Sequence, residues 1–358
     1  MKILYSVQAT GNGHISRAIQ LMPYLEQYGT VDIFLSGNNC HLDSSLPVKY
    51  RSKGCSLFYG NKGGLDYLKM WKELNIKKIW QEAKELPVEK YDLVINDFES
   101  ITSLACKLKK KKSIQFGHQA SFQSPLTPRP KKQDLFGELI LKNYATADAY
   151  FGLHFNAYDN NIYNPIIKSE IVDCTPTDNG HISVYLSHYS VAVIQQYFFQ
   201  MPDVFFEVFS KEIKESYTIR NIRFFPISNE GFTNSVIHSH GVITGAGFET
   251  PAEALYLGKK LLCLPIKGQY EQACNAAALE QLGVTIIPSI GLNFTKQLEK
   301  WMNSTAIPTL ALQHNTYAIV QQVIEQGRAL TPPLENWQPD NNFWINGTMD
   351  YSAETNKL

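Results

Sequence analysis

The sequence predicts an α/β protein built from two doubly wound, Rossmann-like halves. Short apolar runs alternate with segments of helical periodicity in the first half, and the same alternation starts again near Ile182. This alternation is typical of a parallel sheet with helices on both faces. The chain has 358 residues, which is enough for two domains of about 150 residues each.

In the first half, the alternation begins at the amino terminus. Residues 3–7 read as a strand, and after two glycines the apolar residues from Ile15 to Leu25 recur at helical spacing. The later elements follow in the same way. We expect strands over 31–35, 48–59, 91–95, 113–116 and 149–155, and helices over much of 64–86 and over 101–110. Ligands of such sheets bind at the carboxyl ends of the strands, where His14 and Asp97 are expected.

The polar stretch 156–164 is the expected connection between the halves. Strands over 182–186, 204–209 and 222–226 are expected to begin the second half, and a helix over 310–326 to close it. After Leu330 the chain is rich in Pro, Asn and Trp, which predicts irregular structure. We therefore divide the chain into residues 1–160, residues 161–330 and a terminal segment, 331–358.

The segment 241–283 carries the densest set of chemical signals. Apolar strands at 242–243 and 260–265 are each followed by a polar loop. The first loop contains Gly245 and Gly247, and Thr250 followed by Pro251 predicts that a helix begins there. Backbone N–H groups at such a helix start, approached over glycines, suit a pyrophosphate. Side chains of the second loop would lie beside the same ligand.

A second glycine turn, Gly11-Asn12-Gly13, follows the first strand and precedes His14. A Gly-x-Gly turn in this position also occurs in dinucleotide-binding domains. Those domains need an acidic residue at the end of the second strand to bind the ribose, whereas this chain has Ser36-Gly37-Asn38-Asn39. We therefore disfavour NAD and expect no cofactor.

The segment 241–283 resembles the donor-binding half of the GT-B nucleotide-sugar glycosyltransferases. The closest branches are the family 1 UDP-glycosyltransferases and the family 28 N-acetylglucosaminyltransferase that makes lipid II. In these enzymes a glycine turn meets the diphosphate, a Glu on the next helix binds the ribose, and an acid–Gln pair before Asn-Ala holds the sugar. The matching positions are Gly245, Gly247 and Thr250 for the diphosphate, Glu253 for the ribose, and Glu271 with Gln272 before Asn275-Ala276 for the sugar.

The resemblance also implies roles for the first half, which would bind the acceptor. In family 1, a His after the first strand deprotonates the acceptor and an Asp after a later strand orients that His. The matching residues are His14 and Asp97, and the turn Gly11-Asn12-Gly13 would meet the phosphate or the acceptor. An imidazole can take a proton near neutral pH while a carboxylate fixes its tautomer. The resemblance further suggests that the segment 331–358 crosses back to the first domain.

Two positions depart from the family 1 pattern. Many members have His where this chain has Gly245, and Asn where it has Glu249. A carboxylate close to a diphosphate is electrostatically unfavourable unless it turns away. Glu249 and His118, which follows another strand, are therefore cleft candidates without an assigned role.

Several of these residues also have a purely structural interpretation. Thr250 and Glu253 fit a capping box, in which Glu253 bonds the backbone at the start of its own helix. Glu271 suits the first turn of any helix. His118 follows a strand, and a loop His that bonds only to backbone is common.

The composition bears on whether the protein binds nucleic acid and on the cellular compartment in which we expect it. The formal net charge is zero, which argues against a dedicated nucleic-acid binder. The six cysteines are scattered without a C-x-x-C pair and predict free thiols in a reducing compartment. No signal peptide or membrane-spanning run is apparent, so we expect a cytoplasmic protein. The lysine-rich run Lys107–Lys112 is expected to be solvated, and it could also contact anionic lipid at the inner face of a membrane.

The sequence as a whole predicts a GT-B glycosyltransferase that moves a sugar from a nucleotide-sugar donor, which we expect to be UDP-linked, to an acceptor hydroxyl. The family pattern implies inversion, and the lack of a D-x-D motif predicts that no metal is required. The acceptor, whether lipid-linked, glycan or small molecule, is not identified; cell-envelope or glycoconjugate synthesis would suit it. Two alternatives stay open, namely a nucleotide-sugar 2-epimerase or hydrolase of the same fold, and a non-catalytic nucleotide-sugar-binding protein.

Overall fold

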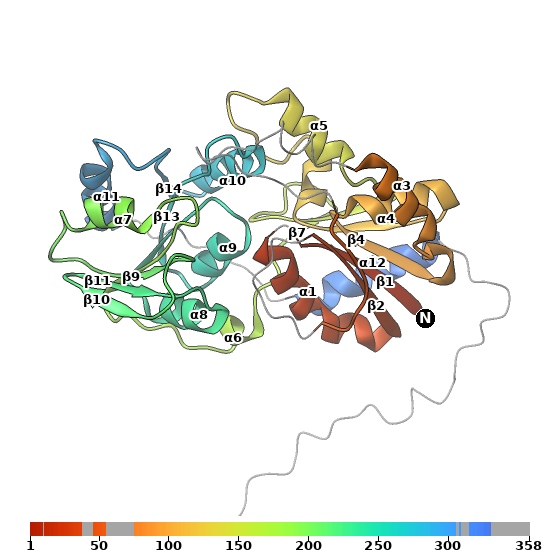
Figure 1. Ribbon diagram of the computed structural model, residues 1–358, viewed down its shortest axis with the longest axis horizontal. Helices are drawn as coiled ribbons and strands as arrows, with labels where there is room; N and C mark the ends of the chain where they lie inside the picture. Colours follow the sequence, from red (N-terminus) through yellow and green to blue (C-terminus); the bar gives the residue numbers. More distant parts are fainter. Residues whose placement is uncertain (10, 38–45, 55–74, 306–307, 309–314, 331–358) are drawn as a thin grey trace, which may run out of the picture.

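The computed structural model describes residues 1–9, 11–37, 46–54, 75–305, 308 and 315–330, and in this part of the chain it contains two seven-stranded sheets. The sheets form two lobes, with the amino-terminal lobe at the right of Figure 1. The first sheet contains β1 (Lys2–Gln8), β2 (Thr30–Ser36), β3 (Val48–Ser52), β4 (Leu93–Asp97), β5 (Ile114–Gly117), β6 (Ala149–Leu153) and β7 (Ile162–Tyr163). The second contains β8 (His181–Tyr185), β9 (Phe205–Phe209), β10 (Tyr217–Ile219), β11 (Ile222–Phe225), β12 (Gly241–Thr244), β13 (Lys260–Cys263) and β14 (Thr285–Ile286).

Helices connect the strands and cover both sheets. The α-helices are α1 (Asn12–Leu25), α3 (Ile76–Glu85), α4 (Ser100–Lys109), α5 (Leu135–Asn143), α6 (Ser169–Val172), α7 (Val191–Phe198), α8 (Asn229–His238), α9 (Glu249–Tyr256), α10 (Tyr270–Gln281), α11 (Phe294–Met302) and α12 (Thr316–Leu330). Short 3₁₀ helices lie at η1 (Glu26–Tyr28), η2 (Val88–Lys90) and η3 (Gln119–Gln123). Side-chain caps mark the start of some of the helices; α4, for example, begins after Glu99, whose carboxylate accepts from the backbone N–H groups of Ile101 and Thr102.

The two sheets share one winding order. The first runs β3-β2-β1-β4-β5-β6-β7 and the second β10-β11-β9-β8-β12-β13-β14. Among the described strands, only β10 pairs antiparallel, with β11. The order reverses between β1 and β4 in the first sheet and between β8 and β12 in the second, which is where doubly wound sheets form ligand crevices. The predicted fold class, two doubly wound Rossmann-like halves, is confirmed.

Alternate residues of the first sheet face two different cores. Ile3 and Tyr5 belong to the cluster that includes α1 and α12, whereas Leu4 packs with Ile101 of α4 and Ala83 of α3. Both faces of the sheet are therefore covered, which explains why its strands read as nearly continuous apolar runs.

Two elements differ from the sequence expectation. The helix expected over 310–326 to close the second half is α12, and it packs against α1, β4 and β5 of the first half. Its apolar pattern shows that one face is buried but does not say against which sheet. The expected connection 156–164 contains β7, which adds a seventh strand to the first sheet.

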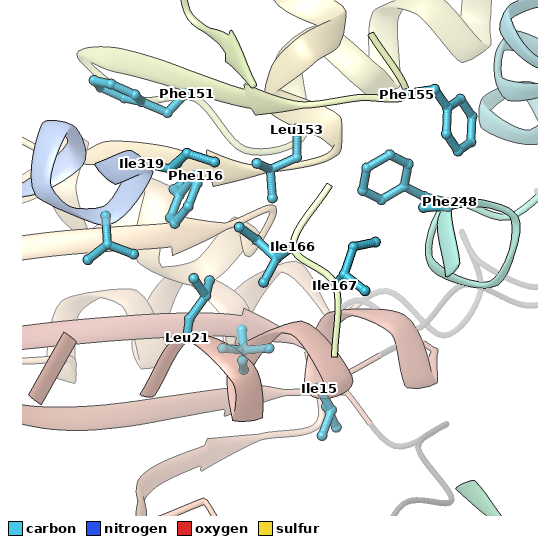
Figure 2. Close-up of a cluster of buried hydrophobic side chains, with 14 of the residues drawn as sticks. Ile15, Leu21, Phe116, Phe151, Leu153, Phe155, Ile166, Ile167, Phe248 and Ile319 are labelled. Atoms are coloured by element: carbon cyan, nitrogen blue, oxygen red, sulfur yellow. The ribbon is translucent and has the colours of Figure 1, made fainter. Parts of the chain in front are cut away.

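The two halves share a continuous apolar core. Figure 2 shows Phe248, from the turn before α9, lying close to Phe155, just after β6. The ring centroids of Phe155 and Phe248 are 5.2 Å apart. Ile166 and Ile167, in the segment that links the halves, are buried in the same cluster. Apolar packing therefore joins the lobes beside the edge where the predicted site residues lie.

Some expectations fall outside the described residues. These are Asn38-Asn39, the strand part over 55–59, the helix part over 64–74, the first residues of the expected closing helix, 310–314, the segment 331–358, and two of the cysteines, Cys40 and Cys55. The other four cysteines are present as free thiols. Within the described ranges, no helix has the length and apolar character needed to cross a membrane.

Candidate active site

The predicted pair His14 and Asp97 is formed. His14 lies in the first turn of α1, and its Nδ1 is 3.0 Å from Oδ1 of Asp97 at the end of β4. The strands β1 and β4 are parallel neighbours, so the residues that follow them meet at one edge. Gly117 gives the carboxylate room, because a Cβ at that position would lie 2.4 Å from Oδ1 of Asp97.

Arg17, which the sequence analysis did not single out, shares this carboxylate. It lies one turn after His14 on α1, and its Nη2 is 2.8 Å from both carboxylate oxygens of Asp97, with Nε 3.1 Å from Oδ2. The side chains of Arg17 and Asp97 are 2% and 0% exposed. Burial opposes the charge of Asp97, but Arg17 and then His14 outweigh it, and the pKa of Asp97 is lowered.

Glu249 turns toward the first half. Its carboxylate pairs with Nη1 of Arg17, so one guanidinium joins Asp97 of the first sheet to the start of α9 in the second half. The glycine at Gly13 allows this approach, since a Cβ there would meet Cγ of Glu249 at 3.1 Å. Burial, opposed by Arg17, raises the pKa of Glu249 to about 7.

The glycine turn of the second half lies between β12 and α9. The helix begins at Glu249 with Phe248 as its N-cap, not at Thr250 as expected, and Pro251 therefore lies inside the first turn. A Cβ at Gly247 would have no neighbour within 4 Å, so the backbone there is open to a ligand. Gly245 lies under Gln272, whose Oε1 would be 3.4 Å from such a Cβ.

Gln272 and Glu253 already have partners within the protein. Oε1 of Gln272 accepts from the backbone N–H of Ile266 at 2.9 Å, which fixes the loop after β13. Glu253 does not form the capping box, because α9 has no side-chain cap; its carboxylate pairs with Nζ of Lys168 at 3.1 Å. Burial raises the pKa of Glu253, and Lys168 opposes that shift. The carboxylate of Glu253 is therefore paired within the second half.

One side chain bridges the two halves beside His14. Nε2 of Gln119 donates to Oε2 of Glu271 at 3.1 Å and lies 3.5 Å from Nε2 of His14. Glu271 is in the first turn of α10, as expected. The predicted base and the predicted sugar-binding carboxylate are thus brought together across the junction.

His118 lies at the same junction, on the buried side. Its Nδ1 is 2.9 Å from the carbonyl oxygen of Leu153 and its Nε2 is 2.8 Å from Oδ1 of Asn275 in α10. The ring stacks on Phe248 with centroids 4.0 Å apart. Burial lowers the pKa of His118, although the carboxylate of Glu271 raises it. His118 therefore bonds to backbone, as the structural interpretation proposed, and it also contacts the second half.

The remaining predicted positions, Gly11 and Asn12, lie at the start of α1. Gly11 is the N-cap of α1 and Asn12 its first residue, and a Cβ at Gly11 would meet nothing within 4 Å. Within the described part of the chain, no group of three or more His, Cys, Asp or Glu side chains is arranged to hold a metal ion.

Solved structures of similar fold are glycosyltransferases. UGT89C1 of Arabidopsis thaliana, complexed with UDP, matches with a TM-score of 0.56 and 12% identity, covering 91% of this chain and 94% of that one. MurG of Acinetobacter baumannii matches with a TM-score of 0.55 and 14% identity, covering 90% and 99%. UGT2 of Phytolacca americana, complexed with UDP-2fluoro-glucose and pterostilbene, matches with a TM-score of 0.56 and 11% identity, covering 92% and 94%.

At this level of identity the structural matches establish the fold, which is GT-B. No curated protein sequence matches the chain. The sequence model described as "Glycosyl transferase family 1" matches residues 1–302, which is most of the chain. The protein therefore belongs to glycosyl transferase family 1 and is a glycosyltransferase of the GT-B fold.

Proposed function

We propose that this enzyme transfers a sugar from a UDP-linked donor to an acceptor hydroxyl by a single, inverting displacement in which His14 is the base. The observation that carries the proposal is the position of Gln119, whose Nε2 is 3.5 Å from His14 and 3.1 Å from Glu271. The group proposed to take the acceptor proton and the group proposed to hold the sugar therefore lie one side chain apart. Structural relatives described as complexed with UDP or a UDP-sugar analogue support the choice of nucleotide.

In this mechanism the acceptor hydroxyl lies at Nε2 of His14, on the side opposite to Asp97. The hydroxyl proton moves to Nε2 while the acceptor oxygen attacks the anomeric carbon, and the bond from that carbon to the diphosphate breaks. Asp97, at 3.0 Å from Nδ1, stabilises the imidazolium that forms. The leaving nucleoside diphosphate carries the bonding electron pair, and backbone N–H groups at the start of α9 would stabilise its charge.

A thermal-shift screen tests the donor. UDP-, GDP-, TDP- and ADP-glucose would each be compared with the free nucleotide, with and without EDTA. A ligand present at 100 times its Kd stabilises the folded state by about 2.7 kcal/mol. We expect a shift with UDP-glucose that survives EDTA. No shift with any nucleotide would contradict the proposal.

A matched pair of glycine variants locates the site. A Cβ meets no neighbour within 4 Å at either Gly247 or Gly291, and neither position has a positive φ, so alanine should be tolerated at both. Gly247→Ala should weaken UDP-glucose binding because it crowds the phosphate, whereas Gly291→Ala should not. Equal affinities in the two variants would place the phosphate elsewhere.

His14→Ala distinguishes an enzyme from a binding protein of the same fold. With His14 as the base, this variant should still bind UDP-glucose but lose turnover of the donor by about 100-fold or more. Unchanged turnover would remove His14 from the mechanism. Turnover of the donor to free sugar without any acceptor would favour the hydrolase alternative.

A further inference from the structure

The ion pair between Arg17 and Glu249 lies at the phosphate end of the proposed donor site. Glu249 is the first residue of α9 and follows the turn that contains Gly245 and Gly247. The start of a helix attracts anions, so this is where a diphosphate would be placed. In the structure the Glu249 carboxylate occupies this end, and it is paired with a cation from the other half.

The guanidinium divides its donors between the halves. Nε and Nη2 of Arg17 bond to Asp97, whereas Nη1 reaches across the junction to Glu249. Among the described residues, the ion pair of Glu249 runs to Arg17 alone. A planar guanidinium binds phosphate oxygens as readily as carboxylate oxygens. Nη1 is thus a charged donor aimed at the place where the diphosphate should lie.

We propose that Arg17 is a donor-phosphate residue supplied by the first half, and that Glu249 keeps its place until the diphosphate displaces it. The inference rests on the proposed function, because it assumes that a nucleotide sugar binds at this turn. It also resolves the unfavourable placement of a carboxylate beside a diphosphate. On displacement, Arg17 stabilises the charge that develops on the leaving diphosphate, and it remains joined to Asp97 behind the base.

The displacement of Glu249 by the diphosphate should depend on pH, because the carboxyl of Glu249 can gain or lose a proton. The charged groups that face it are Arg17 and His14 of α1, Asp97 of β4 and Glu253 of its own helix. Burial, with Glu253 and Asp97, outweighs the two cations and raises the pKa of Glu249 to about 7. Below this pH the carboxyl is neutral and competes weakly for Arg17. Above it the carboxyl is ionised. Donor binding separates this carboxyl from Arg17, whose charge lowers its pKa, and brings the negative diphosphate beside it, so the pKa should rise further in the complex and binding should take up a proton. Affinity for the donor should therefore be about tenfold weaker at about pH 8 than at about pH 6.

Calorimetric titration with UDP-glucose and with uridine tests the proposal. UDP-glucose is suitable because its diphosphate diester keeps a constant charge over this range, and uridine has no phosphate. Glu249→Gln should bind UDP-glucose about tenfold more tightly than the unmodified protein at about pH 8, and equally at about pH 6. Glu299→Gln, which removes an exposed carboxylate of α11, is the matched control and should change neither affinity.

A second variant tests the cation itself. Arg17→Lys keeps a positive charge but loses the planar fork, so it should weaken UDP-glucose binding severalfold while uridine binding is unchanged. Equal or weaker binding of UDP-glucose by Glu249→Gln at about pH 8, with uridine binding intact, would overturn this inference alone. Failure of the unmodified protein to bind either ligand would overturn the proposed function, and with it the role of Arg17.

Discussion

Replacing Arg17 by Met should destabilise the fold far more than the loss of a surface ion pair. Met keeps an unbranched apolar stem but ends near the position of Nε, so the substitution removes the guanidinium with its charge and its hydrogen bonds. The side chains of Arg17 and Asp97 are 2% and 0% exposed. An exposed pair contributes about 0–1 kcal/mol, whereas removing one partner of a buried pair costs about 3–5 kcal/mol. Because both side chains are buried, we expect the larger loss of stability, about 3–5 kcal/mol.

The loss of stability in Arg17→Met should be larger at high pH than at low pH. In the unmodified protein the pKa of Asp97 is lowered, because Arg17 and His14 outweigh burial. The ionised Asp97 therefore stabilises the folded protein at pH values above its pKa in the unfolded chain. This stabilisation is lost as the pH falls through the pKa that Asp97 has in the folded protein. Without Arg17, burial favours the protonated carboxyl. The variant should then be about 3–5 kcal/mol less stable at about pH 8, and the difference should shrink toward about pH 5.

Urea unfolding at the two pH values measures this effect. Arg223→Met, at an exposed position of β11, is the control and should cost less than about 1 kcal/mol. The double variant with Arg17→Met and Asp97→Asn should lose less stability than the sum of the losses in the two single variants, because it no longer contains an unpaired buried carboxylate. A free energy of unfolding for Arg17→Met that equals that of Arg223→Met at about pH 8 would contradict this prediction, and so would additive effects of Arg17→Met and Asp97→Asn.

Two further predictions concern contacts around the junction. A Cβ on Gly137 of α5 would lie 2.5 Å from Cβ of Tyr270 in α10. Gly137→Ala should therefore overpack this contact, reduce the stability by about 1–3 kcal/mol and lower the melting temperature. An unchanged melting curve would contradict this contact. Lys168→Met should leave Glu253 buried without its cation. Since burial already raises the pKa of Glu253, the variant should lose stability as pH rises, by about 3–5 kcal/mol at about pH 8, and an equal deficit at about pH 5 would argue against the pair.

The fold was predictable because its signals are local. Apolar runs and helical spacing identified the strands that became β1, β4 and β12, and the topology of doubly wound sheets then placed His14 and Asp97 at one edge. The packing of α12 was not predictable, because a buried helical face does not specify its partner sheet.

The charge network of the site was only partly predictable. Arg17 contacts Asp97 across 80 residues of sequence and Glu249 across 232, and no short-range pattern reports such separations. Its place three residues after His14 was the available signal, because such residues share a helix face. The sequence also indicated that a carboxylate at Glu249 would be unfavourable beside a diphosphate unless it turned away, but it did not indicate a partner for that carboxylate.

A crystal structure with UDP bound would show directly whether the nucleotide lies at the start of α9. We expect the diphosphate against the backbone of residues 245–250, with its terminal phosphate facing His14 and Arg17, and with Glu249 turned away from the guanidinium. UDP bound instead at the turn Gly11-Asn12-Gly13 of the first half, or with its phosphates remote from His14, would contradict it.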